Sequence, residues 1–372
     1  MYGVVGDGTT DDTVRLNELL SYASLNGYIV FLDSGIYLVT DTVYVPPNSR
    51  IVGEALGSVI LAAGPAFGDM ENPRPVVQVA NQGDVGYLQW SDTIISTRGA
   101  CAGAILIQYN LLTEGTPSGM WDVHARVGGF AGSDLQLSQC AKTIGSDSVN
   151  PSCIAAYMTI HITASAGGLY TENCWYWVAD HDLEDPLYSQ IAIYAGRGML
   201  IESQGGPIWL SATSSEHHVL YQYQLANTKD IYLGHTQTES PYYQPHPPAS
   251  SPFPVVPALN DPDFAADCAY RSDSEGCEWA WGMRILDSTN VVAYGAGLYS
   301  FFKDWNNTCA YDKVGSKCQA RILSVSGDLD GVKLAGYSTV GSKFMVEKDG
   351  RDLVPAYLNN NTFGDTLALY LP

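Results

Sequence analysis

The sequence predicts an all-β protein folded as a single-stranded, right-handed parallel β-helix with an N-terminal capping helix. Short aliphatic and β-branched runs recur along most of the chain, separated by Gly, Asn and Asp. Residues 208–216 align with residues 231–239, and this offset of 23 residues suits one coil of a parallel β-helix. One helical pattern precedes these runs, where it can cover the open end of the stack.

The first predicted element is a turn and capping helix over residues 1–27. Thr and Asp residues at positions 9–13 can cap a helix that ends at Asn26-Gly27. The helix carries apolar residues at Val14, Leu16, Leu19, Leu20 and Ala23. Asp11 and Asp12 could instead bind a metal ion, but capping is the commoner role of aspartates at such positions.

The strands then follow at short intervals, and we expect residues 1–372 to form one β-helix domain. The predicted strand segments are 28–32, 35–39, 43–45, 50–53, 103–107, 155–162, 198–202, 208–216, 231–239, 287–294 and 331–335. The alignment extends to residues 290–299 and places Tyr299 where Glu216 and Glu239 stand. The segment 241–264 contains eight prolines and is predicted to be a stiff loop insertion beside Glu239, either a cleft wall or a surface excursion.

Composition excludes several classes of partner. With 372 residues and 46% hydrophobic content, the chain can bury a large core. Its net charge of −21 argues against nucleic acid and anionic membranes, which need clustered Lys and Arg, and favours a neutral or cationic ligand. No apolar run is long enough to span a bilayer.

The cysteine pattern indicates an oxidising compartment. Three pairs are close in sequence and predict short disulfides, namely Cys140 with Cys153, Cys268 with Cys277, and Cys309 with Cys318. Cys101 and Cys174 are either buried thiols or a fourth bridge, and zinc is disfavoured because no Cys-x-x-Cys pair exists. Glycosylation sequons at Asn306 and Asn360 agree with a secreted, extracellular protein, whose signal peptide we expect outside the given sequence.

The aligned glutamates are the leading candidates for chemistry. In a β-helix with this period, Glu216 and Glu239 would lie one above the other on one face. A neighbouring like charge raises one pKa of such a pair, as a general acid requires. The alternative is that both are solvated strand ends. His217 and His218 could suggest a metal, but adjacent strand residues point to opposite faces, so at most one shares the glutamate side.

Aromatic residues crowd the same part of the sequence. They are Trp175, Trp177, Trp209, Tyr242, Tyr243, Phe301 and Phe302. Aromatic rings beside two carboxylates suggest carbohydrate hydrolysis, because sugar rings stack on them, although core packing explains most single aromatics. The acidic segment 177–185 could bind calcium, accept hydrogen bonds from sugar hydroxyls, or form a solvated turn.

These segments carry a family resemblance. The opening residues 2–13 resemble the entry segment of pectate-lyase-like (pectin-lyase-like) β-helices. The segments Trp177-Val-Ala-Asp-His-Asp182, 201–204, Ser215-Glu-His217, 220–224, Gln237-Thr-Glu-Ser-Pro-Tyr-Tyr-Gln-Pro245 and 294–302 together resemble the glycoside hydrolase family 55 β-1,3-glucanases. This resemblance implies an inverting, exo-acting enzyme that releases glucose from β-1,3-glucan, with no metal or other cofactor.

The resemblance also implies residue roles. Glu239 matches the family's general acid and Glu216 its supporting carboxylate, while Trp177, Asp180 and Tyr242 match residues that hold the terminal glucose. Family members carry two tandem β-helices, and this chain resembles the second, C-terminal one.

A missing N-terminal β-helix domain is therefore an expected partner, because it would supply the groups that position the attacking water. Glu216 lies too close to Glu239 to act as the base of an inverting reaction, so the isolated chain is expected to show weak activity or none. The alternatives are a polysaccharide lyase on the same fold, which the scarcity of Lys and Arg disfavours, and a non-catalytic glucan-binding solenoid.

Overall fold

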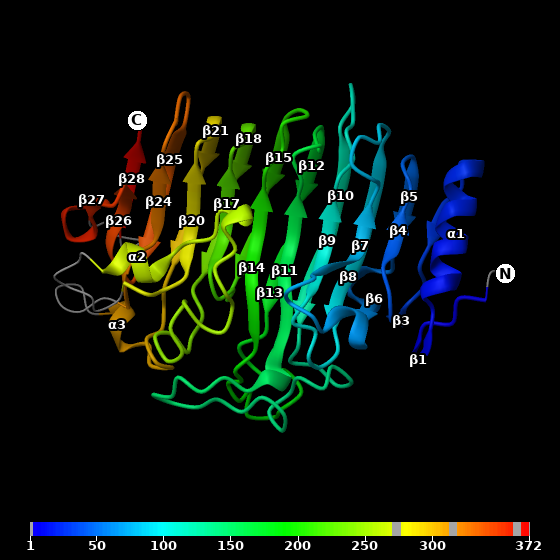
Figure 1. Ribbon diagram of the computed structural model, residues 1–372, viewed down its shortest axis with the longest axis horizontal. Helices are drawn as coiled ribbons and strands as arrows, with labels where there is room; N and C mark the ends of the chain where they lie inside the picture. Colours follow the sequence, from blue (N-terminus) through cyan, green and yellow to red (C-terminus); the bar gives the residue numbers. More distant parts are fainter. Residues whose placement is uncertain (1–2, 270–276, 312–317, 360–365, 372) are drawn as a thin grey trace.

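The computed structural model describes residues 3–269, 277–311, 318–359 and 366–371 and shows a parallel β-helix. Its coils lie side by side from α1 (Thr13–Asn26) at one end to the last strands at the other (Figure 1). The predicted fold class is confirmed, because nearly all strand pairs are parallel and join each coil to the next.

Each central coil contributes one strand to each of three faces. The back face contains β4 (Val43–Val45), β7 (Arg74–Val79), β9 (Ala104–Tyr109), β11 (Ile154–Ile162), β14 (Tyr194–Ile201), β17 (Tyr221–Ala226), β20 (Trp281–Leu286) and β24 (Leu323–Ser326). The side face contains β2 (Ile29–Phe31), β5 (Ser49–Val52), β12 (Leu169–Glu172), β15 (Ile208–Ser211), β18 (Lys229–Gly234) and β21 (Thr289–Tyr294).

The third face carries both candidate glutamates, and we call it the glutamate face. It contains β1 (Asp7–Asp11), β3 (Gly35–Val39), β6 (Ser58–Ala62), β13 (Trp175–Val178), β16 (Ser214–Glu216), β19 (Gln237–Glu239) and β22 (Gly297–Tyr299). Three long strands run from the side face onto the glutamate face, β8 (Leu88–Thr97), β10 (Ser118–Val127) and β25 (Lys333–Val340).

Each aligned segment is two strands instead of one. In 208–216 and 231–239 the chain bends between the side face and the glutamate face. The bends are at Ala212, His235 and, one coil later, Gly295, with φ of 50°, 53° and 70°. This left-handed conformation turns the chain without breaking the register, so the sequence alignment survives although the strand boundaries differ.

The interior is a stack of aliphatic side chains in register. Leu210 lies opposite Leu233, Leu233 opposite Ala293, and Ala293 opposite Leu334, and all four are fully buried. Each coil therefore buries its inward side chains against the next, which explains why the hydrophobic pattern repeats with the coil.

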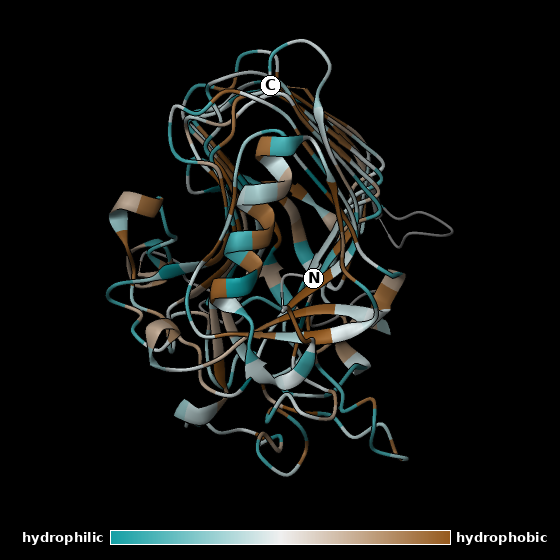
Figure 2. Cartoon of the chain, turned by 90° about the vertical axis from the view of Figure 1, so that its right-hand side faces the viewer, coloured by the Kyte–Doolittle hydropathy of each residue, from teal (hydrophilic) through white to brown (hydrophobic). Residues whose placement is uncertain are grey.

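The helix α1 covers the N-terminal end of this stack, as predicted (Figure 2). It ends at Gly27, whose φ of 69° is the left-handed conformation that glycine favours. Leu16 and Leu20 are buried, whereas Val14 is 64% exposed. The two aspartates act locally, since Asp11 accepts a hydrogen bond from the Thr13 amide and Asp12 accepts from two amides of the entry turn.

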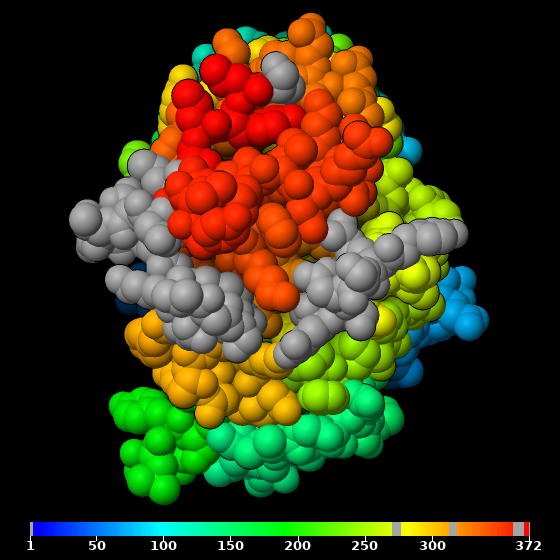
Figure 3. Space-filling model, turned by 90° about the vertical axis from the view of Figure 1, so that its left-hand side faces the viewer, coloured from blue at the N-terminus to red at the C-terminus, as the bar shows by residue number. Residues whose placement is uncertain are grey.

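Residues from the last part of the chain cover the C-terminal end (Figure 3), and two of the strand pairs there are antiparallel. β28 (Thr366–Tyr370) pairs antiparallel with β25, and β27 (Arg351–Pro355) pairs antiparallel with β26 (Ser342–Lys348). β23 (Gln319–Arg321) pairs with β26, and the short helices are α2 (Phe264–Cys268) and α3 (Thr308–Tyr311). None of the described helices is long and apolar enough to cross a bilayer.

All three predicted disulfides are present. Cys140 bonds Cys153, and the other two pairs are bonded as the sequence predicted. Cys101 and Cys174 are buried free thiols, which settles the choice that the sequence left open. Asn306 is exposed, whereas the sequon at Asn360 lies outside the described residues.

After the glutamate face, the chain turns to the back face through a corner of variable length. The corner segments are 128–153 after β10, 179–193 after β13, 217–220 after β16, and 240–269 with 277–280 after β19. The first two form the green loops at the lower edge of Figure 1. The coil of Glu216 thus has a short corner between coils with long ones.

The Pro-rich loop 241–264 begins at the glutamate face and then packs on the back face. It contains a short 3-10 helix, Pro257–Leu259. Asp261 pairs with Arg197 of β14, and both side chains are fully buried. The guanidinium also lies over the Tyr157 ring at 4.2 Å. The loop is therefore anchored, and its first residues form a wall of the site.

Candidate active site

Glu216 and Glu239 are Cα partners on neighbouring parallel strands, as the alignment predicted. The same row continues to Trp177 on one side and to Tyr299 on the other. Gln237 joins the two carboxylates, because its amide Nε2 donates to Glu216 Oε1 at 3.1 Å and to Glu239 Oε1 at 3.4 Å. The Glu216 residue is 6% exposed, whereas the Glu239 side chain is 19% exposed.

The environment of Glu216 favours its protonated form. Burial raises the pKa of Glu216 to about 7, and the nearby Glu239 and Asp180 carboxylates add to this effect. The cationic His217 and a hydrogen bond from Trp175 Nε1 at 2.8 Å oppose it. One buried carboxyl group therefore keeps its proton up to near-neutral pH.

His217 is the cation of the site. Its φ of 69° turns the chain at the end of β16, so its ring lies among the carboxylates while His218 points into the core. Its Nδ1 donates to the Val178 carbonyl at 2.9 Å, and its Nε2 is 3.4 Å from Glu239 Oε2. Although burial alone lowers the pKa of His217, the Asp180 and Glu239 carboxylates outweigh it and raise the pKa to about 9.

The second histidine is structural. His218 Nε2 lies 2.6 Å from Thr159 Oγ1 in the interior, and burial lowers the pKa of His218 to about 3. Only one of the two adjacent histidines therefore faces the glutamates, as predicted, but it is His217, because the left-handed backbone at His217 interrupts the alternation of the strand.

Asp180 is a buried carboxylate at the edge of the pair. Its Oδ1 is 3.7 Å from His217 Nδ1, and its Oδ2 accepts from His181 Nδ1. Burial opposes ionisation of Asp180, but the two histidines outweigh it and lower its pKa to about 2. Asp180 is thus an ionised hydrogen-bond acceptor beside Glu239.

Tyr242 covers this cluster from the Pro-rich loop. Its ring stacks on Phe302 with the centroids 3.6 Å apart and meets the edges of His217 and His181 at 4.9 and 5.8 Å. Burial and the Asp180 and Glu239 carboxylates raise the pKa of Tyr242, so its hydroxyl stays neutral. Tyr243, in contrast, points into the core and packs on Tyr194.

The exposed aromatic surface belongs to Trp175, which had no individual predicted role. Trp177 is only 6% exposed, whereas Trp175 is 43% exposed and stacks on Trp177 with the ring centroids 5.0 Å apart. Trp175 also donates its indole N–H to Glu216. The alternation of the strand could have indicated that Trp175 and Trp177 share a face.

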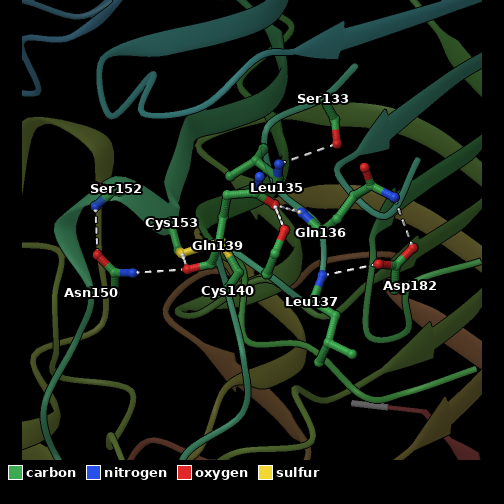
Figure 4. Close-up of a disulfide and its surroundings, with 11 residues drawn as sticks. Ser133, Leu135, Gln136, Leu137, Gln139, Cys140, Asn150, Ser152, Cys153 and Asp182 are labelled. Atoms are coloured by element: carbon green, nitrogen blue, oxygen red, sulfur yellow. Dashed lines mark hydrogen bonds between the residues drawn. A yellow bond between two sulfur atoms is a disulfide. The ribbon is translucent and has the colours of Figure 1, made fainter. Parts of the chain in front are cut away.

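The acidic residues of segment 177–185 have different roles, because Asp180 belongs to the site and Asp182 holds a loop. Asp182 accepts a hydrogen bond from the Leu137 amide at 2.9 Å and from the Gln136 side chain, so it fixes the segment that leads into the Cys140–Cys153 disulfide (Figure 4). In the parts of the chain that the structure describes, no three His, Cys, Asp or Glu side chains converge as metal ligands.

Comparison with known proteins shows close relatives in sequence. A family model described as rhamnogalacturonase A/epimerase, pectate lyase-like, matches residues 1–167. The chain is 43% identical over 353 residues to a glucan 1,3-beta-glucosidase of Cochliobolus carbonum, covering 94% of this chain and 43% of that protein. It is 44% identical over 370 residues to a probable glucan endo-1,3-beta-glucosidase of Arthroderma benhamiae, covering 99% of this chain and 40% of that protein.

A solved structure has a similar fold. A variant of sacteLam55A from Streptomyces sp. SirexAA-E in complex with glucose matches with a TM-score of 0.54 at 15% identity, over 95% of this chain and 51% of that chain. The chain therefore spans less than half the length of each of the two sequence relatives above and about half of this structure.

Proposed function

Since this chain is related over nearly its whole length to a glucan 1,3-beta-glucosidase and to a probable glucan endo-1,3-beta-glucosidase, and has the pectate-lyase-like β-helix fold, we propose that it is a glycoside hydrolase that releases glucose from β-1,3-glucan. The observation that carries the proposal is the pair Glu216 and Glu239, in register on one face and surrounded by aromatic rings and a buried aspartate. Paired carboxyl groups are what glycoside hydrolysis requires.

In this proposal Glu239 protonates the glycosidic oxygen. The raised pKa of Glu216 means that this side chain holds a proton up to about pH 7, and Gln237 links its carboxyl group to that of Glu239. Glu239 is the more exposed member and so the one that reaches a substrate oxygen. Glu216 tunes the acid, and His217 and Gln237 hold the Glu239 carboxyl in place.

The terminal glucose would lie against Asp180, Tyr242 and Trp177. An ionised Asp180 can accept hydrogen bonds from two sugar hydroxyls, and the neutral Tyr242 hydroxyl can donate one. The buried Trp177 would form the base of this subsite. Release of single glucose units requires that the substrate chain ends here, and the Tyr242–Phe302 stack is a suitable end wall.

We also propose an inverting reaction that needs groups from outside this chain. Carboxyl groups of inverting enzymes are ~6.5–9.5 Å apart to leave room for the attacking water. Glu216 and Glu239 lie on adjacent strands, and such strands are separated by only ~4.8 Å. The water-positioning groups would then come from a further β-helix domain of a longer, secreted protein, an environment with which the three disulfides agree.

The experiment compares Glu239→Gln with the parent on two substrates, in a protein that also contains the further β-helix domain proposed above. On β-1,3-glucan, loss of the proton donor should lower kcat by about 10²–10⁴-fold. On an aryl β-glucoside whose phenolate leaves without protonation, the same change should cost much less. Equal losses on both substrates, or a leaving-group-dependent loss in Glu216→Gln instead, would show that Glu239 is not the acid.

A further inference from the structure

A hollow adjoins the site on its N-terminal side and has no assigned role. It has a volume of about 470 Å³, which is within the usual range of ligand pockets. We define this groove by its lining residues on β8, β10, β13 and the adjoining turns. These include Leu56, Asp92, His124, Arg126, Trp175 and Leu183.

Trp175 supplies the flat apolar surface of the groove. It is 43% exposed, and its ring is held in place from two sides, by stacking on Trp177 and by the hydrogen bond from its N–H to Glu216. Its backbone amide donates to His124 Nδ1 at 3.0 Å. A large aromatic face that is fixed before a ligand arrives loses little conformational entropy on binding.

Polar groups stand along one edge of the groove. Asp92 and Asp122, at left-handed bends within β8 and β10, and Asn173, just before β13, occupy equivalent positions of three successive coils, and Asn173 Nδ2 donates to Asp122 Oδ1. Carboxylates and amides at such positions can exchange hydrogen bonds with the hydroxyls of a neutral ligand. Arg126 lines the floor, and its buried Nε has no hydrogen-bond partner among the described residues.

The groove is continuous with the catalytic row. Arg126 is the Cα partner of Trp177, and Trp177 is the Cα partner of Glu216. From β13 to β8 the groove crosses two inter-strand steps, a length of about 10 Å. A chain that ends at Asp180 and Tyr242 could therefore continue past Glu216 into the groove.

We propose that this groove binds the glucosyl units on the leaving-group side of the scissile bond, with Trp175 as the stacking platform. The inference rests on the proposed function, because it assigns the groove to the same β-1,3-glucan chain. An apolar floor with a polar edge suits sugar rings, which present C–H faces and hydroxyl rims. The hydrogen bond from Trp175 to Glu216 links this subsite directly to the carboxyl pair.

The test measures binding of glucose and of β-1,3-linked gluco-oligosaccharides of increasing length by isothermal titration calorimetry. The full chain carrying Glu239→Gln is used, so that no bond is cleaved. Affinity should rise with chain length, and Trp175→Ala in this background should weaken the longest oligosaccharide by about tenfold, or about 1.4 kcal/mol. Glucose binding should weaken less than oligosaccharide binding, because a single glucose in the terminal subsite does not reach the groove.

Two further variants distinguish the loss of ligand stacking on Trp175 from a general effect of substitution on the fold. Leu183→Asp, on the opposite wall and 43% exposed, should weaken the same long ligands. Trp209→Ala is the matched control, because Trp209 lies on the side face of the neighbouring coil and does not line the groove. Equal weakening by Trp175→Ala and Trp209→Ala would overturn the assignment.

The outcomes distinguish this inference from the proposed function. If neither glucose nor any oligosaccharide binds to the Glu239→Gln chain, the proposed function fails and the groove has no assigned ligand. If glucose binds but affinity is independent of chain length, or is unaffected by Trp175→Ala, only the assignment of the groove is wrong.

Discussion

Replacing Glu216 by Gln should change how the stability of this chain depends on pH. Burial raises the pKa of Glu216 from its usual 4.5 to about 7, so the folded chain keeps this proton where the unfolded chain has lost it. The stability that this group contributes is therefore fully present below about pH 4.5 and is lost as the pH rises through about 7. Above that pH, the folded chain contains a buried carboxylate.

The magnitude follows from the same values. At 1.36 kcal/mol for each pH unit, the loss amounts to about 3 kcal/mol between about pH 4.5 and about pH 8. For a chain of 372 residues, this corresponds to about 4 °C in Tm. The folded-state pKa values of His217, about 9, and Asp180, about 2, lie outside this window, so these groups hardly change charge there in the folded chain.

The assay is thermal denaturation followed by circular dichroism at both pH values. Glu216→Gln carries no charge, so its Tm should rise by about 4 °C relative to the parent between the lower and the higher pH. The matched control is Glu172→Gln, since Glu172 is an exposed glutamate on the side face, and its Tm difference from the parent should not depend on pH. A Tm difference for Glu216→Gln that stays constant or shrinks with rising pH would refute the reasoning.

Four further outcomes are expected. His217→Asn keeps a residue type that tolerates the left-handed backbone but removes the cation, so kcat should fall by about 10²-fold and the alkaline limb of the pH–rate profile should move to higher pH; an unchanged profile would contradict this role. Asp261→Asn leaves the buried Arg197 without its counter-charge and should cost about 3–5 kcal/mol, measured as a lower Tm, while a neutral effect would show that the loop anchor is unimportant. Removing the Cys140–Cys153 disulfide by a double change to Ala should cost about 3 kcal/mol for a loop of this length, again measured as Tm, and an unchanged Tm would argue against it. Treatment with EDTA should leave glucan hydrolysis unchanged, whereas loss of activity that calcium restores would favour a lyase-type, metal-dependent reaction.

Much of the fold could be predicted because a β-helix repeats. A period of one coil fixes which residues face each other, so the alignment of Glu216 with Glu239 and Tyr299 predicted their register correctly. The disulfides followed from short spacings. The resemblance to β-1,3-glucanases, read from local motifs, is confirmed by the sequence relatives. The strand boundaries were less accurate, since single left-handed residues such as Ala212 divide the runs.

The electrostatics of the site depends on tertiary packing and could not be predicted. Asp180 and His217 are far apart in sequence, and only the fold brings them within 3.7 Å. The raised pKa falls on Glu216 because that side chain is the more buried one, which no local pattern reveals. The roles of Glu239, Glu216, Trp177, Asp180 and Tyr242 remain predictions that the proposed variants test.

The unequal corners after the glutamate face differ in length from coil to coil, whereas the strand register between coils is constant. Strand register places Glu216 beside Glu239, whereas the walls beside them come from segments such as 179–193 and 240–269, which leave the stack and return to it. Insertions at these corners can lengthen a wall, close one end of the cleft or open it, without moving Glu216 relative to Glu239. If the chain acts on β-1,3-glucan as proposed, loops at these corners can change the length of glucan that it accepts while the two glutamates stay in place.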